Sequence, residues 1–135
     1  MSNEKPPPPG RLLGTGWEPH IDEIDGRLVY SIPVASGHMD YDFQFMIEPS
    51  DLAVLREQPY RRAVLFVLLH QLLQNSTLPS FPTVSQAEFR SLADAVLFEP
   101  NESVEHLIKA TSAEHNVRLH SYIGDEVRRL TASAG

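Results

Sequence analysis

Residues 63–69 read Ala-Val-Leu-Phe-Val-Leu-Leu and form the most apolar run of the 135-residue chain. A run of this length is too short to cross a membrane, which takes about 20 residues, so the rest of the protein must cover it. Pro59 precedes the run and is favoured at the first position of a helix. The pattern predicts a helix from Pro59 to about Asn75 that is apolar all round and lies at the centre of the core.

The sequence ahead of this helix is typical of strands. Asp25-Gly26 is a strong hairpin signal and separates residues 17–24 from residues 27–34, which are rich in β-formers. Pro33 places the end of the second strand at an edge or a bulge. Four side chains at period two then describe a third strand with one buried face, namely Tyr41, Phe43, Phe45 and Ile47. These segments predict an antiparallel β-meander of about three strands.

Further helices are predicted on both sides of the apolar run. The clearest local signal is the capping box Ser85-Gln86-Ala87-Glu88, which predicts a helix over residues 86–98. A short helix capped by Ser50 or Asp51 is expected to end before Pro59. Two more helices are predicted over residues 101–113 and 117–130, the last of them interrupted or weakened at Gly124.

The order of these elements makes the fold class α+β: an N-terminal antiparallel β-meander of about three strands, followed by four or five helices. One domain is expected at this length, covering residues 17–135. Residues 1–16 contain four consecutive prolines and are interpreted as a flexible Pro/Gly-rich tail without the apolar core of a signal peptide. The chain has no cysteine, which excludes thiol chemistry and fits a cytoplasmic location.

The charge of the chain is concentrated in one segment. Residues 17–51 contain one basic side chain, Arg27, and the eight acidic side chains Glu18, Asp22, Glu23, Asp25, Asp40, Asp42, Glu48 and Asp51, so this segment accounts for the whole net charge of −7. Such a negative field repels nucleic acid and anionic lipid and attracts a basic partner. We expect these carboxylates to form a single exposed docking face on the sheet.

Aromatic residues lie among these carboxylates, and an aromatic anchor ringed by acidic groups is typical of a surface that binds an Arg- or Lys-rich partner. The alternative is that Trp17 and Tyr30 pack under the meander and the carboxylates only keep its outer face soluble. The residues predicted to bind the partner are Asp22, Glu23, Asp25, Asp40, Tyr41, Asp42 and Glu48.

No catalytic or cofactor motif is found: the sequence has neither a nucleophile elbow nor a phosphate-binding loop. His38, Asp40 and Asp42 are two residues apart and can share one face of a strand, which allows a small metal-dependent enzyme as an alternative function. His70 lies in the apolar helix and is interpreted as a core or half-buried histidine bonded to backbone, because no orienting carboxylate is identifiable. We therefore predict no catalytic residue, cofactor or metal.

The sequence resembles small bacterial immunity proteins of contact-dependent growth inhibition and polymorphic toxin systems. The resemblance covers about a third of the chain and is found in residues 45–55 (Phe-Met-Ile-Glu-Pro-Ser-Asp-Leu-Ala-Val-Leu), 62–65, 69–74 (Leu-His-Gln-Leu-Leu-Gln), 83–85 and 88–89. It implies a short cytoplasmic protein that binds one cognate toxin domain, often a basic nuclease, and occludes its active site. An acidic secretion chaperone or adaptor is a further alternative, and the sequence does not indicate an oligomeric state.

Overall fold

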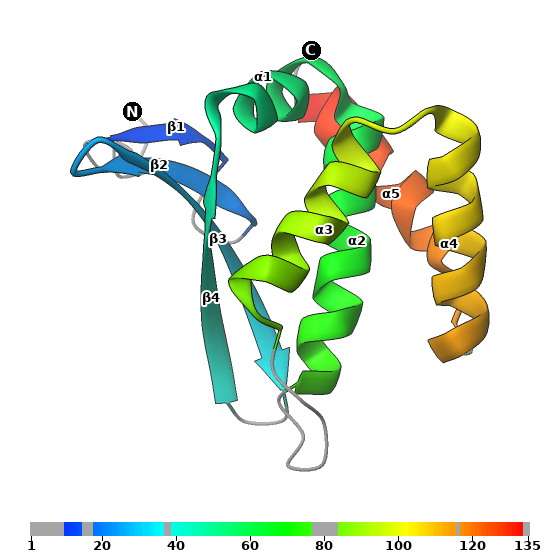
Figure 1. Cartoon of the computed structure of the whole chain (residues 1–135). Coiled ribbons are helices and arrows are strands. Elements are labelled where there is room, and N and C mark those ends of the chain that lie inside the picture. The colour runs from blue at the N-terminus through cyan, green and yellow to red at the C-terminus, as the bar shows by residue number, and fades with distance from the viewer. Residues whose placement is uncertain (1–9, 15–17, 37–38, 77–83, 116, 134–135) are drawn as a thin grey trace.

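The computed structural model describes residues 10–14, 18–36, 39–76, 84–115 and 117–133. A four-stranded antiparallel meander sheet at the N-terminus is followed by five helices, and the helices lie on one side of the sheet (Figure 1). The predicted α+β class, with its strands and helices in separate halves of the chain, is therefore confirmed. No described helix is long and apolar enough to cross a membrane.

The sheet has four strands where about three were predicted. They follow one another in space in the order of the sequence: β1 (Arg11–Leu13), β2 (His20–Ile24), β3 (Arg27–Ser36) and β4 (Met39–Ile47). The three predicted strands correspond to β2, β3 and β4, and the Asp25-Gly26 turn joins β2 to β3. The additional strand, β1, lies in the segment that was predicted to be a flexible tail.

Glycine explains why this prediction was wrong for residues 10–14. Gly10 and Gly14 flank β1 with φ angles of 89° and 87°, a conformation that other residues rarely adopt. A Cβ atom on Gly10 would lie 2.6 Å from the carbonyl oxygen of Glu23, and one on Gly14 would clash with the carbonyl oxygen of Pro19. The two glycines therefore allow β1 to approach β2 closely, and the rest of the predicted tail lies outside the described residues.

The five helices agree with the predicted segments to within a few residues. They are α1 (Pro49–Glu57), α2 (Pro59–Ser76), α3 (Gln86–Leu97), α4 (Asn101–His115) and α5 (Leu119–Ser133). The capping box of α3 is confirmed, because the Ser85 hydroxyl accepts from the Glu88 N–H at 3.1 Å and the Glu88 carboxylate accepts from the Ser85 N–H at 3.3 Å. Of the interruption or weakening predicted at Gly124, the interruption is wrong, since α5 runs through this residue.

Helix α1 begins earlier than predicted. Glu48, and not Ser50 or Asp51, is its N-cap residue, and Pro49 takes the first helical position, where its missing N–H costs nothing. Asp51 occupies the third helical position and accepts from the Glu48 N–H at 2.7 Å. The Asp51 side chain thus caps the helix from inside its first turn.

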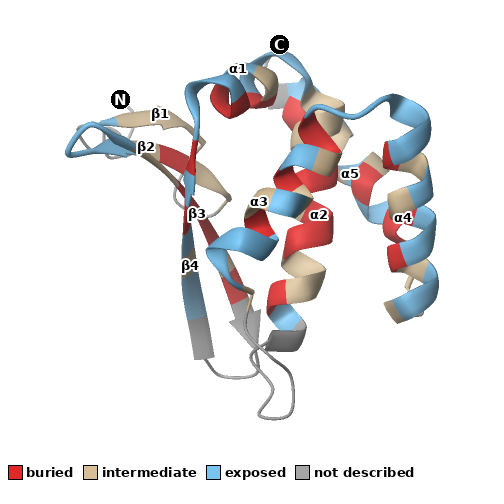
Figure 2. Cartoon of the chain, in the orientation of Figure 1, coloured by how far each residue is buried: buried red, intermediate tan, exposed pale blue. Residues whose placement is uncertain are grey.

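The predicted central helix is confirmed as the middle of the core. Helix α2 contacts β3 and each of the other four helices, and Val64, Leu65, Leu68 and Leu69 are fully buried. In Figure 2 buried residues run along α2 where the sheet and its neighbouring helices meet it. A second part of the core joins α3 to the sheet: the Phe89 ring stacks on the Phe45 ring with centroids 4.5 Å apart.

Candidate functional site

Three of the eight acidic side chains are matched by arginines. Glu18 lies 2.6 Å from Arg129 and 3.7 Å from Arg62, Asp22 lies 2.6 Å from Arg11, and the fully buried Asp51 lies 2.7 Å from Arg90. These arginines are distant in the sequence and reach the carboxylates only in the folded chain. The negative charge of the three side chains is therefore compensated in the fold. The prediction of one exposed face made of all these carboxylates is wrong for these three.

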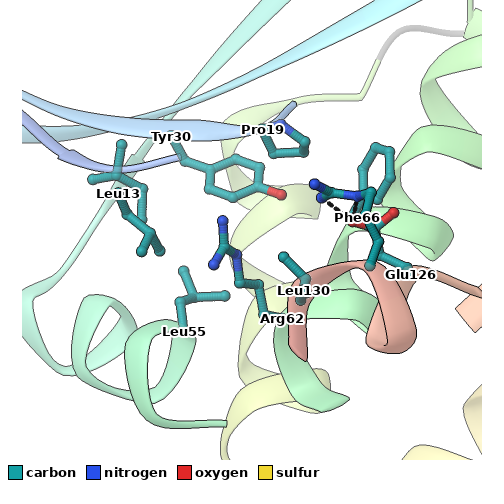
Figure 3. A pocket seen from close by; sticks show the side chains of 10 residues that line it. Leu13, Pro19, Tyr30, Leu55, Arg62, Phe66, Glu126 and Leu130 are labelled. Carbon is teal, nitrogen blue, oxygen red and sulfur yellow. Dashed lines mark hydrogen bonds and ion pairs between the residues drawn. The ribbon is translucent and has the colours of Figure 1, made fainter. Parts of the chain in front are cut away.

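Glu18 takes part in a polar cluster between the sheet and the helices. Arg129 of α5 binds both Glu18 and Glu126, and Arg62 of α2 lies 3.7 Å from the other carboxylate oxygen of Glu18. Figure 3 shows the small cavity beside this cluster, into which Tyr30 points from the sheet and Arg62 from α2. Burial raises the pKa of the Tyr30 hydroxyl well above its usual value, and Arg62 opposes this shift. The cluster therefore joins the two halves of the fold.

The acidic side chains that remain exposed lie in two groups. Glu23, Asp25 and Glu48 are at the end of the sheet that contains the β2–β3 turn. Asp42 lies near the opposite end, five residues before Ile47 along β4, which is roughly 17 Å in an extended strand. Asp22 is half-buried against Arg11. The structure thus separates the predicted binding residues into two regions.

The second region includes an exposed aromatic residue. The Tyr41 side chain is 36% exposed, and its ring stacks on that of Phe43 with centroids 6.2 Å apart. Asp42 points to the other face of β4, is exposed, and has no ion pair with a described residue. Asp40 pairs with Ala35 through the backbone, but its side chain and His38 lie outside the described part of the chain. An exposed aromatic ring and an unmatched carboxylate therefore occupy adjacent positions of one strand, on opposite faces of it.

The alternative metal site is not assembled in the described part of the chain, where no three His, Cys, Asp or Glu side chains are grouped to hold a metal ion. His38 and the Asp40 side chain, which belong to the predicted set, lie outside that part. Trp17, the other aromatic residue that was considered as an anchor, also lies outside the described residues, while Tyr30 is buried. The alternative interpretation of Tyr30 as a core residue is thus confirmed.

A groove between α2 and α5 was not predicted. It has a volume of about 640 Å³, within the size range of ligand sites. Its apolar lining residues include Phe66 and Val67, and Tyr122, which also lines it, is 57% exposed. The remaining lining residues are His70, Gln71, Gln74, Val117, Leu119, Asp125, Glu126 and Arg129. The only signal in the sequence was the series Phe66, His70 and Gln74 at spacing four on one side of an otherwise apolar helix.

His70 is half-buried at this groove, as predicted, and its ring meets that of Phe66 edge-on at 5.7 Å. Asp125 and Glu126 of α5 line the same groove, but they pair with Arg128 and Arg129. Burial lowers the pKa of the His70 imidazole. The imidazole of His70 is therefore neutral in the fold at neutral pH.

This lowered pKa predicts a pH-dependent contribution of His70 to stability. As pH falls below about 6.5 the unfolded chain takes up a proton on His70 before the folded chain does, so the free energy of unfolding decreases towards the lowered pKa. Urea unfolding between about pH 5 and pH 8 should give a flatter pH profile for His70→Gln than for the unmodified protein. His106→Gln, on the exposed side of α4, is the matched control. A constant difference between His70→Gln and the unmodified protein across this range would contradict the prediction.

Comparison with known proteins gives no relative whose site can be placed beside this one. No protein-family model matches the chain, and no curated protein or solved structure matches it. The residues of this chain are therefore the evidence for its function.

Proposed function

We propose that this chain is a binding protein of the immunity type, which neutralises a basic toxin domain, in particular a nuclease, by covering its active site. The observation that supports this proposal is the exposed pair formed by Tyr41 and Asp42 near the β3–β4 end of the sheet. Asp42 is not matched by any described cation, whereas Asp22, Glu18 and Asp51 are. An unmatched carboxylate and an exposed ring at consecutive positions of a strand suit a cationic partner that contacts this strand.

The active site of a nuclease must attract phosphate and is therefore basic. In the proposed complex Asp42 takes the place of a phosphate group, and Tyr41 contributes apolar contact area on the other face of the same strand. Asp40, the neighbour of Tyr41 in the sequence, adds a further negative charge. The second acidic group, formed by Glu23, Asp25 and Glu48, extends the negative field along the sheet and accelerates the encounter with the partner.

Replacing Asp42 with Asn tests the proposal. The partner is the polypeptide encoded immediately upstream of this chain's gene, purified with its catalytic residue removed. We expect the association rate constant to fall several-fold at low salt, and its dependence on salt to weaken, because one steering charge is lost. Stopped-flow measurements over a salt series give both quantities.

Glu102→Gln is the matched control, because it removes the same charge from the exposed start of α4, away from the sheet (Figure 1). This variant should associate as fast as the unmodified protein. If Asp42→Asn associates at the control's rate, Asp42 does not steer the encounter. If the gene lies in a biosynthetic operon with no toxin-type reading frame beside it, the immunity assignment fails.

The groove between α2 and α5 favours a second candidate, the secretion chaperone or adaptor. Such proteins use apolar surfaces for dimerisation and client binding, and Phe66, Val67 and the exposed Tyr122 provide one. A monomeric species in analytical ultracentrifugation at concentrations of about 100 μM would count against this candidate. The same result is compatible with an immunity protein.

A further inference from the structure

The two edges of the sheet differ in how far they are protected against pairing with another strand. Strand β1 is three residues long, contains Arg11, and has an irregular register between Arg11 and Leu13. Strand β4 is nine residues long, pairs with β3 without a bulge, and contains no Lys, Arg or Pro. Short length, irregularity and basic residues are the usual means of blocking an edge. The β1 edge therefore has these features and the β4 edge lacks them.

The open backbone groups of β4 can be identified from Met46. Its N–H donates to the side-chain oxygen of Gln86 and its carbonyl accepts from the Gln86 side-chain nitrogen, both at 2.9 Å. Met46 faces Val29 of β3 in the register, so this pair is not hydrogen-bonded across the ladder. Because the direction of the backbone groups alternates along a strand, Gln44 and Asp42 also direct their N–H and carbonyl groups away from β3.

Pro33 provides independent support for this assignment. It is paired with Asp42 and has no N–H, which a hydrogen-bonded pair with β4 would require. The nitrogen of Pro33 therefore faces the other side of β3, where the pairing with β2 has already ended at Ser31. No carbonyl group of β2 is left without a hydrogen-bond donor by the missing N–H. Of the edge or bulge predicted at Pro33, the structure has the edge, and the strand continues past it to Ser36.

The amide of Gln86 binds Met46 as a neighbouring strand would, but it covers one residue only. No described residue donates to or accepts from the backbone groups of Asp42 or Gln44 along this edge. With respect to the described residues, Asp42 and Gln44 thus each offer one donor and one acceptor in the arrangement that an added strand requires.

The side chains beside this edge specify the chemistry of the added strand. Asp42 and Gln44 are exposed on one face of β4, while Tyr41 and Phe43 lie on the other. A second copy of this chain fits poorly, because pairing β4 with itself brings Asp42 near another acidic strand. A strand with Lys or Arg on one face and apolar side chains on the other is complementary to both faces.

We propose that β4 receives an extended, cationic segment of a partner protein, which adds to the sheet as a fifth strand beside Asp42 and Gln44. This inference rests on the proposed function and names how the basic partner is held. Affinity then comes from the backbone hydrogen bonds, and selectivity comes from Asp42 on one face and the Tyr41 and Phe43 rings on the other.

The test compares Gln44→Pro with Gln44→Ala. Both variants remove the Gln44 side chain, but only proline removes the N–H, and proline is tolerated where that N–H faces solvent. The probe is a fluorescein-labelled peptide of about ten residues that alternates lysine and valine, long enough to cover β4. We expect Gln44→Ala to bind it as the unmodified protein does and Gln44→Pro to bind it about tenfold more weakly.

Two further peptides separate strand addition from simple charge attraction. The lysine-valine peptide N-methylated at every second residue keeps its charge and should lose binding, and a glutamate-valine peptide should not bind. Equal dissociation constants for Gln44→Pro and Gln44→Ala, or equal binding of the N-methylated peptide, would overturn the inference. Absence of binding at about 1 mM peptide would also overturn it, as would self-association of the unmodified protein that Gln44→Pro abolishes.

A measurement on the unmodified protein covers the case in which Gln44→Pro does not fold. Amide hydrogen exchange at Asp42 and Gln44 should be fast in the free protein and slow in the peptide complex, and unchanged exchange at both residues would refute strand addition. Failure of the added strand can be distinguished from failure of the proposed function. If Asp42→Asn slows association with the toxin domain while Gln44→Pro and Gln44→Ala bind that domain equally, the charge proposal stands and only the added strand is lost.

Discussion

Replacing Arg90 with Met is expected to lower the free energy of unfolding by about 3 kcal/mol, near the lower end of the range for breaking a buried ion pair. Asp51 is fully buried, and both of its oxygens accept from the Arg90 guanidinium at 2.7 Å. Without Arg90 the carboxylate retains only the Glu48 N–H as a described hydrogen-bond donor. The expected loss stays near 3 kcal/mol because Arg90 is 30% exposed, so water can partly replace it.

Urea unfolding followed by circular dichroism measures this loss. Asp94→Ala is the matched control, because Asp94 binds the same guanidinium but is 58% exposed on the surface of α3. An exposed pair of this kind contributes less than about 1 kcal/mol. If Arg90→Met and Asp94→Ala destabilise the protein equally, the Arg90–Asp51 pair is not what secures α1 against α3.

Replacing Phe89 with Ala is expected to have an effect of similar or larger size, about 3 to 5 kcal/mol. The side chain is fully buried, and its ring stacks on Phe45 at 4.5 Å and meets Tyr30 at 5.9 Å. The substitution removes these contacts and leaves a cavity between α3 and the sheet. Since Phe45 belongs to β4, the loss should also increase the mobility of the strand to which we assign partner binding.

Phe98→Ala provides the comparison for Phe89→Ala, because Phe98 ends the same helix and is 48% exposed. A surface substitution of this kind changes stability by about 0.5 kcal/mol or less. The melting temperatures of the two variants show how much of the loss of stability comes from removing a buried ring and how much comes from removing any phenylalanine ring. A similar melting temperature for the two variants would contradict the burial of Phe89 between α3 and the sheet.

The helical half of this fold could be predicted from sequence because its signals are local. The capping box at Ser85, the proline at position 59 and the apolar run of residues 63–69 each act over a few neighbouring residues, and the structure confirms all three. Strand β1 could not be predicted in this way. Its three residues lie next to glycines, which are as common in flexible segments as in tight backbone contacts.

The charge pattern was informative only in part, for a physical reason. Counting charges along the sequence treats each carboxylate as free, whereas Arg11, Arg90 and Arg129 reach Asp22, Asp51 and Glu18 only once the chain has folded. The prediction for Tyr41 and Asp42 agrees with their exposure, because no arginine folds onto that part of β4 among the described residues. The open backbone edge beside them follows from strand order and register, which the sequence alone did not specify.

The contact between Glu18 and Arg129 has a consequence for the order of events in folding. The two side chains are separated by more than one hundred residues along the chain, and closing a loop of that length in an otherwise unfolded chain costs about 4 kcal/mol of entropy. An ion pair whose arginine is half exposed returns less than about 1 kcal/mol, so it cannot form first. The meander and the helices must assemble before the pair closes, and its loss therefore speeds unfolding while the folding rate stays nearly constant.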